Sequence, residues 1–227
     1  MDWKGNKIEA IIFDMDGVVI DSEPLWKIAE ISAFSSIGVQ ITETDLQETV
    51  GLRIDQVVAY WRNKIPWSTQ ISDSDVVNKI VDGVVSLVEE RGKPLIGVHE
   101  LLNWLKVNGY KIGLATSSYH KIVNAVLKKL ELQNYFDVTC SAEDEQYGKP
   151  HPAVFLSCAN QLKVDPTKCL VIEDSFNGLL AAKAASMHTI VVPDQSNEPH
   201  PHLHIADCIA RDLIVVKAML ELADKTK

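Results

Sequence analysis

The chain has 227 residues, of which 46% are hydrophobic, and a formal net charge of −9 at pH 7. This length fits one large domain, or one domain with a smaller second one, and the apolar content excludes wholesale disorder. Nucleic acids and anionic membranes need a basic surface, so neither is expected as a partner. An anionic small molecule stays possible, because it needs only a local positive site.

The first residues, M-D-W-K-G-N-K, are polar, and no apolar run approaches the roughly 20 residues of a membrane span. We therefore expect a soluble, cytoplasmic protein. Nothing in the sequence demands an oligomer, so a monomer is expected. Four cysteines lie in apolar surroundings without metal-type spacing, which favours buried, reduced thiols: Cys140, Cys158, Cys169 and Cys208.

Short apolar runs rich in β-branched residues predict buried strands. In chain order they cover residues 8–13, 111–115, 169–172 and 189–192. Helical patterns fill the later gaps, at residues 99–107, 120–130, 152–162 and 177–185. Strands that alternate with helices predict an α/β fold with a parallel sheet covered on both faces.

The segment after the first strand breaks this alternation. It holds three helical patterns and no convincing strand, at residues 23–37, 53–64 and 75–91. Ser22 and Ser72 precede two of these patterns as candidate N-caps. We expect a small α-helical cap over residues 21–91, inserted into a core of residues 1–20 and 92–227.

Two aspartates, Asp14 and Asp16, follow the first predicted strand in the run I-I-F-D-M-D-G. Strand residues two apart project to the same side, and the carboxyl ends of parallel strands are where α/β sheets bind ligands. Two carboxylates held close together need a cation, for which Mg²⁺ is well suited. A plain Asp-Gly turn at a strand end is the alternative.

Three further motifs follow later segments of the same predicted sheet. Thr116-Ser117 precedes a helix and suits either a phosphate or an ordinary N-cap. Lys149, between Gly148 and Pro150, could neutralise a phosphate or be a solvated loop lysine. Glu173-Asp174 offers metal ligands or a helix N-cap.

Together, Asp-x-Asp, Thr/Ser, Lys and Glu-Asp follow one another at four predicted strand ends. In this order the chain resembles the haloacid dehalogenase-like superfamily over essentially its whole length, and within it the β-phosphoglucomutase-like subgroup with a small helical cap. Three stretches are similar to bacterial phosphatases of hexitol phosphates and 2-deoxyglucose 6-phosphate: D-S-E-P-L-W from Asp21, V-G-L-R-I-D from Val50, and Pro66-Trp67. The resemblance implies a Rossmann-like core and Mg²⁺-dependent hydrolysis of small sugar phosphates, with a phosphomutase as the alternative.

The resemblance also implies roles for the motif residues. Asp14 would attack phosphorus and form an aspartyl-phosphate, and Asp16 would act as acid and base. Thr116, the Ser117 backbone N–H and Lys149 would bind the phosphate. Mg²⁺ would be held by Asp14, the Asp16 carbonyl and Asp174, with Glu173 behind them. Asp16 also argues against dehalogenases, which lack the second aspartate because a halide leaving group needs no proton.

The predicted cap offers candidates for substrate contact. We expect Arg53 to touch the substrate, with pairing to Asp55 or Asp45 as the alternative. Trp26, Trp61 and Trp67 could stack on a sugar, although at least two of them should form the core of the cap. Trp26 stands where the mutases carry a histidine, which favours a phosphatase.

Two other interpretations remain. A signalling receiver domain also uses acids, a Thr/Ser, a Lys and Mg²⁺, but its accepting aspartate lies on a later strand and no cap follows the first. The alternating histidines His200, His202 and His204 resemble a metal clip. A proline interrupts them, so we predict a surface loop.

Overall fold

The computed structural model describes residues 1–49, 51–194 and 200–225; Val50, the first residue of the V-G-L-R-I-D motif, lies outside them. Its main sheet has six parallel strands in the order β5-β4-β3-β6-β7-β8. The strands are β3 (Ala10–Phe13), β4 (Lys111–Thr116), β5 (Val138–Ser141), β6 (Cys169–Glu173), β7 (His188–Val191) and β8 (Cys208–Ile209). The predicted α/β class and its parallel sheet are confirmed. A separate hairpin pairs β1 (Asp2–Trp3) with β2 (Asn6–Lys7).

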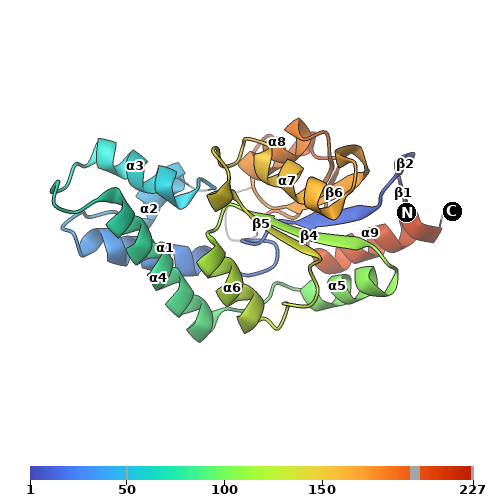
Figure 1. Ribbon diagram of the computed structural model, residues 1–227, viewed down its shortest axis with the longest axis horizontal. Coiled ribbons are helices and arrows are strands. Elements are labelled where there is room, and N and C mark those ends of the chain that lie inside the picture. The colour runs from blue at the N-terminus through green and yellow to red at the C-terminus, as the bar shows by residue number, and fades with distance from the viewer. Residues whose placement is uncertain (50, 195–199, 226–227) are drawn as a thin grey trace.

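Helices cover both faces of the main sheet (Figure 1). They are α5 (Val98–Val107), α6 (His120–Lys129), α7 (Ala153–Leu162), α8 (Phe176–Ala184) and α9 (Leu213–Lys225). Side chains of β3 alternate between the two layers: Ile11 and Phe13 pack with α5, α6 and α9, whereas Ala10 and Ile12 pack with α7 and α8. Because both faces are covered, β3 is apolar at every position.

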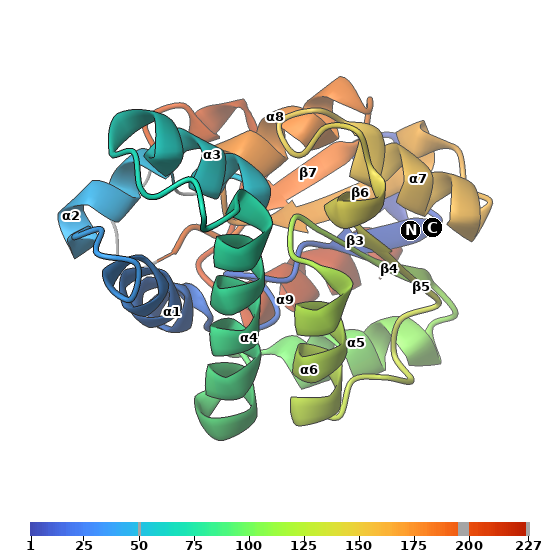
Figure 2. The same cartoon turned by 60° about the vertical axis from the view of Figure 1, so that its left-hand side comes forward.

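Residues 23–91 form four helices between β3 and β4: α1 (Glu23–Ser35), α2 (Glu43–Leu46), α3 (Ile54–Lys64) and α4 (Asp73–Arg91). Figures 1 and 2 show them grouped beyond one end of the sheet, with α4 running beside α6. Capping boxes begin α2 at Thr42 and α4 at Ser72. Gly83 lets α4 approach α1, since a Cβ there would lie 3.3 Å from that of Ala29. The exact division between core and cap stays a prediction.

Short 3₁₀ segments complete the described chain: η1 (Gln47–Thr49), η2 (Ala142–Asp144), η3 (Pro166–Lys168) and η4 (Leu203–Ile205). In the part of the chain that the structure describes, no helix has the length and apolar character needed to cross a bilayer. All four cysteines are free, and three of them are buried.

Candidate active site

Asp14 lies directly beyond β3, at the carboxyl end of the central strand. Its backbone N–H donates to the Ile172 carbonyl of β6 at 2.9 Å, which extends the strand pairing by one residue. The side chain is buried, and its Oδ1 accepts a hydrogen bond from Lys149 Nζ at 2.7 Å. The first predicted carboxylate is therefore fixed at the edge where the strands end.

Lys149 joins two acids from neighbouring strand ends. Its buried ammonium donates to Asp14 and, at 2.7 Å, to Glu173 Oε1, and also to the Ala115 carbonyl at 3.1 Å. The lysine lies on the loop between η2 and α7 rather than at a strand end, so only three of the four expected strand ends carry a motif. Its place is nevertheless fixed, because all three ammonium protons have acceptors.

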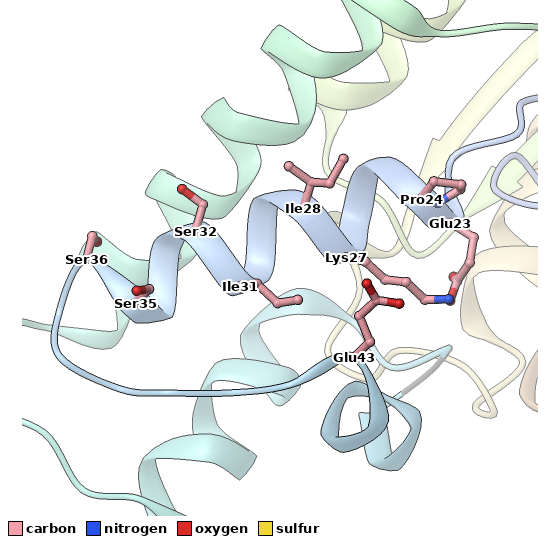
Figure 3. A pocket seen from close by; sticks show the side chains of 9 residues that line it. All are labelled: Glu23, Pro24, Lys27, Ile28, Ile31, Ser32, Ser35, Ser36 and Glu43. Carbon is pink, nitrogen blue, oxygen red and sulfur yellow. The ribbon is translucent and has the colours of Figure 1, made fainter.

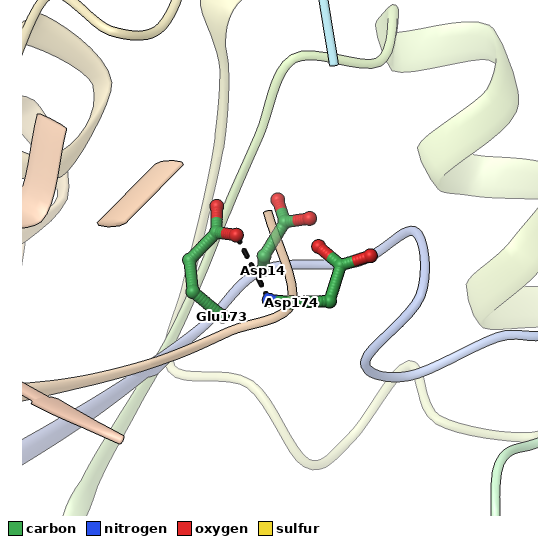
Figure 4. A group of neighbouring side chains, drawn as sticks. All are labelled: Asp14, Glu173 and Asp174. Atoms are coloured by element: carbon green, nitrogen blue, oxygen red, sulfur yellow. Dashed lines mark hydrogen bonds between the residues drawn. The ribbon is translucent and has the colours of Figure 1, made fainter. Parts of the chain in front are cut away.

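Three carboxylates, those of Asp14, Glu173 and Asp174, gather around one point (Figure 4). Each offers one oxygen, and these atoms lie within 4.8 Å of one another. Glu173 Oε2 accepts from the backbone N–H groups of Asp174 and Ser175, both at 2.9 Å. Since both Glu173 oxygens are engaged, Glu173 is suited to hold Lys149 and the turn, whereas Asp14 and Asp174 are suited to hold a cation.

Two glycines make room for these acids. A Cβ on Gly17 would lie 1.9 Å from Asp174 Oδ2, and one on Gly178 would lie 1.6 Å from Glu173 Oε1. Gly17 also has φ +73°, a left-handed conformation that favours glycine. Any side chain at either position would displace a carboxylate of the cluster.

The electrostatics of the cluster follow from its excess of acids. Burial, partly offset by Lys149, raises the pKa of Asp14 to about 7. Burial together with Glu173 and Asp14 raises the pKa of Asp174 well above its ordinary value. Burial alone would raise the pKa of Glu173, but Lys149 outweighs it and lowers that pKa. One lysine does not neutralise three carboxylates, so the cluster keeps excess negative charge. Its oxygen ligands and this charge fit a hard divalent cation such as Mg²⁺.

Asp16 lies outside this cluster and has its own set of donors. Its Oδ1 accepts from Ser22 Oγ at 2.5 Å and from Trp26 Nε1 at 3.0 Å, and its Oδ2 accepts from Ser118 Oγ at 2.7 Å. Because β3 ends at Phe13, strand alternation does not extend to Asp16. Sequence reasoning missed Ser118 and these contacts of Ser22 and Trp26, since a hydroxyl or indole carries no motif of its own.

Thr116 and Ser117 lie where β4 ends. Thr116 is buried, and its Oγ1 accepts from the Ser118 backbone N–H at 3.0 Å. The Oγ of Ser117 is buried and has no hydrogen-bond partner among the described residues. An unpaired hydroxyl beside Thr116 is the feature that a bound phosphate oxygen would satisfy.

Arg53 joins the helical segment to the core. Its guanidinium forms a two-point pair with Asp55, at 2.6 and 2.8 Å, and donates to the carbonyls of Ala142 and Glu145 at 2.6 and 2.8 Å. The pairing with Asp55 is thus present, and substrate contact by Arg53 stays a prediction. The backbone packs closely here, because a Cβ on Gly148 would lie 3.2 Å from that of Arg53.

The family model of haloacid dehalogenase-like hydrolases matches residues 11–192. This span contains every residue of the acidic cluster and its lysine. The chain belongs to the haloacid dehalogenase-like hydrolase family. The expected superfamily is confirmed, and the protein is an enzyme.

Named relatives of this hydrolase include phosphatases. It is 45% identical over 202 residues to hexitol phosphatase B of Escherichia coli (strain K12), covering 88% of this chain and 90% of that one. It is 32% identical over 185 residues to the phosphorylated carbohydrates phosphatase of Thermotoga maritima, covering 81% and 84%. Its structure also resembles the crystal structure of β-phosphoglucomutase from Clostridium difficile, with a TM-score of 0.80, 27% identity and coverage of 96% and 98%.

The tryptophans of this haloacid dehalogenase-like hydrolase divide as expected. Trp61 and Trp67 are buried in the helical segment, where Trp67 packs edge-on against Phe34 with ring centroids 6.0 Å apart. Only Trp26 reaches a candidate catalytic group. Two of the three therefore belong to the core of the cap, and sugar stacking by Trp26 stays a prediction.

Two surface features of the hydrolase lie apart from the cluster. A hollow is lined by residues of α1, among them Glu23, Lys27 and Ile28, and by Glu43 of α2 (Figure 3). His200, His202 and His204 are exposed, with His200 stacked on Phe176 at 4.0 Å between ring centroids. Among the described residues, the candidate metal-binding group is the acidic one of Asp14, Glu173 and Asp174, and the metal ligands expected from the sequence stay a prediction.

Proposed function

We propose that the protein is a Mg²⁺-dependent phosphatase that hydrolyses small sugar or hexitol phosphates through an aspartyl-phosphate. The observation that carries this proposal is the group of Asp14, Lys149, Glu173 and Asp174 at the edge of the sheet where Thr116 and Ser117 also lie. It combines a nucleophile, a fixed positive charge and spare oxygen ligands at one edge of the sheet.

The reaction has two displacements at phosphorus. In the first, an Asp14 carboxylate oxygen forms a bond to phosphorus while the bond to the sugar oxygen breaks, and Asp16 gives that oxygen a proton. In the second, water attacks the phosphorus of the aspartyl-phosphate, Asp16 takes a proton from the water, and Asp14 leaves as a carboxylate. The enzyme returns to its starting state with phosphate and the free alcohol released.

The other residues hold the phosphoryl group and its charge. Lys149 lies against Asp14 and would offset charge on the phosphoryl oxygens, and Thr116 with Ser117 would donate to them. A divalent cation held by Asp14, Asp174 and the Asp16 carbonyl would offset the repulsion between an anionic nucleophile and an anionic substrate. Residues 21–91 would act as a cap that limits the entry of water.

The names of the relatives support a phosphorylated carbohydrate as substrate. A hexitol phosphatase and a phosphorylated carbohydrates phosphatase are among them. The β-phosphoglucomutase neighbour keeps a phosphomutase as the second candidate. Trp26 favours the phosphatase. Its indole donates a hydrogen bond to Asp16, and it stands at the position where the mutases have a histidine.

The test is release of inorganic phosphate from a panel of hexose, deoxyhexose and hexitol phosphates. With Mg²⁺ we expect turnover, loss on chelation and recovery when Mg²⁺ is restored. Asp14→Asn should lower kcat by roughly a thousandfold or more, since it removes the nucleophile. Asp82→Asn, at an exposed acid paired with Lys121, is the matched control and should retain activity. Conversion of glucose 1-phosphate to glucose 6-phosphate with little free phosphate would establish the mutase instead.

A further inference from the structure

Glu30 of α1 holds a polar atom that the fold leaves unpaired. Its Oε2 is buried and has no hydrogen-bond partner in the described part of the chain. Burial and the nearby acid Glu23 raise the pKa of Glu30 to about 8, so the group is mostly neutral at pH 7. A buried polar group without a partner destabilises the fold. Within the residues that the structure describes, no hydrogen bond to this atom explains why an acid stands here.

The position of Glu30 on α1 relates it to the active site. Trp26 lies four residues earlier, about one turn or 6 Å along the axis, and projects from the same face of the helix. The Trp26 indole reaches Asp16 at 3.0 Å. This face of α1 therefore leads from Asp16 into the cap. The hollow of Figure 3 runs along the same helix and is lined by Lys27 and Glu23, which lie one and two turns before Glu30, as well as by Ile28 and Ser32.

We propose that Glu30 binds a hydroxyl group of the leaving group, and that the site accepts a neutral, polyhydroxylated chain or ring there. The inference rests on the proposed function, in which Asp16 protonates that leaving group. A protonated carboxyl both donates and accepts a hydrogen bond, as a hydroxyl does. Binding would thus satisfy the atom that the folded chain leaves unpaired.

Among the described residues, the cations expected near a second phosphate are already engaged. The charged group that acts on Glu30 is Glu23, which is itself paired with Lys27 at 3.3 Å. Arg53, the arginine expected to meet the substrate, is engaged by Asp55 and two carbonyls. The Glu30 subsite thus favours monophosphates with an uncharged tail over bisphosphates.

Steady-state kinetics on two substrates test the subsite: D-sorbitol 6-phosphate, which carries several hydroxyls, and phenyl phosphate, which carries none. Glu30→Met keeps the length of the side chain but removes its hydrogen bonds, and Glu30→Gln retains a donor and an acceptor. Glu30→Met should raise KM for sorbitol 6-phosphate about tenfold, the loss of roughly one hydrogen bond. Its kcat/KM for phenyl phosphate should stay within about twofold, and Glu30→Gln should stay within about threefold on both substrates.

Glu43→Gln is the control. It changes an exposed acid of α2 at the hollow of Figure 3 and should leave the kinetics on both substrates unchanged. Equal losses on the two substrates would assign Glu30 a structural role and overturn the subsite, as would an unchanged KM for sorbitol 6-phosphate. Either of these outcomes leaves the proposed function standing. A wild-type enzyme that releases phosphate from neither compound, nor from the wider panel, would overturn the proposed function and the subsite with it.

Discussion

Lys149 donates to two of the three clustered carboxylates, so one positive charge faces three acidic groups. Two carboxylates already exceed what one ammonium can neutralise, and both Asp14 and Asp174 respond with a raised pKa. A cation bound there would lower these pKa values and hold Asp14 in the ionised form that the proposed attack on phosphorus requires. Lys149, which offsets part of this negative charge in the fold, is also the residue that we propose to contact the phosphate.

The raised pKa of Glu30 should also affect how the stability of the folded protein depends on pH. Its carboxyl ionises near 4.5 in the unfolded chain and near 8 in the folded one. Between these pH values the folded state holds more protons, so the free energy of unfolding falls as pH rises. Glu30→Gln lacks this dependence, and the difference in Tm, variant minus wild type, should grow from pH 5 to pH 8.

Thermal unfolding across that pH range measures the effect, with the non-titrating Ser32→Ala of α1 as control. The Tm difference for Ser32→Ala should be flat. A flat difference for Glu30→Gln as well would mean that Glu30 is ionised at neutral pH in the folded protein.

The sequence motifs predicted the charged residues of the site, but they did not predict the residues that position these charged groups. Asp14, Lys149 and Glu173 stand in short patterns, and the structure brings them together. The donors to Asp16 come from two separate segments, the start of α1 and the end of β4, so only the tertiary fold reveals them. Likewise, nothing in the sequence around Arg53 indicates the carbonyls of Ala142 and Glu145 as its acceptors.

The turn after β3 is the element on which the site depends most. Gly17 and Gly109 share the same φ of +73°, but a Cβ on Gly17 would overlap Asp174 whereas one on Gly109 would meet nothing within 4 Å. Gly109→Ala should therefore lower the free energy of unfolding by about 1 kcal/mol, the cost of the left-handed backbone. Gly17→Ala should lower it by roughly 3 kcal/mol or more and abolish phosphate release.

Urea denaturation of the two variants gives the comparison directly. The cost of the left-handed backbone is common to both variants. The difference between their losses in free energy of unfolding is therefore the cost of crowding Asp174. Equal losses of stability would show that the turn relaxes and that Asp174 tolerates the added methyl group.

Strands with a continuous apolar run could be predicted from the sequence. Very short elements, and elements whose composition does not match their structure, could not. The predicted strands at residues 8–13, 111–115, 169–172 and 189–192 correspond to β3, β4, β6 and β7. The V-T-C-S run of β5 has exposed and polar positions, and β8 has two residues, so neither gives a periodic signal. In α9 the run Ile214-Val215-Val216 has a β-branched composition that hides the helical spacing of Leu213, Val216 and Leu220.

At the scale of the whole molecule, Arg53 ties the helical segment to the loop that carries Lys149. Its bonds to Ala142 and Glu145 cross from α3's N-cap to the η2 region. If the arginine positions this loop, Arg53→Ala should increase amide hydrogen exchange over residues 142–149 about tenfold in the absence of substrate, from the loss of roughly 1.4 kcal/mol.

Arg62→Ala is the matched control, because Arg62 lies on the same helix but bonds to Asp73 and Ile71 within the helical segment. It should leave exchange over residues 142–149 unchanged. Unchanged exchange in Arg53→Ala, together with a raised KM, would instead favour the direct substrate contact expected from the sequence.

The position of β3 has a consequence for biosynthesis. Ala10 pairs with Lys111 on one side and with Cys169 on the other, so the strand that precedes Asp14 is the first of the main sheet to be made, and its two neighbours follow about 100 and 160 residues later. While the chain emerges from the ribosome, α1 can already pack on α4, but β3 must wait for segments that are synthesised much later. A nascent chain that stops before β6 would therefore leave one edge of the apolar strand β3 unpaired, and a chaperone is expected to recognise it there.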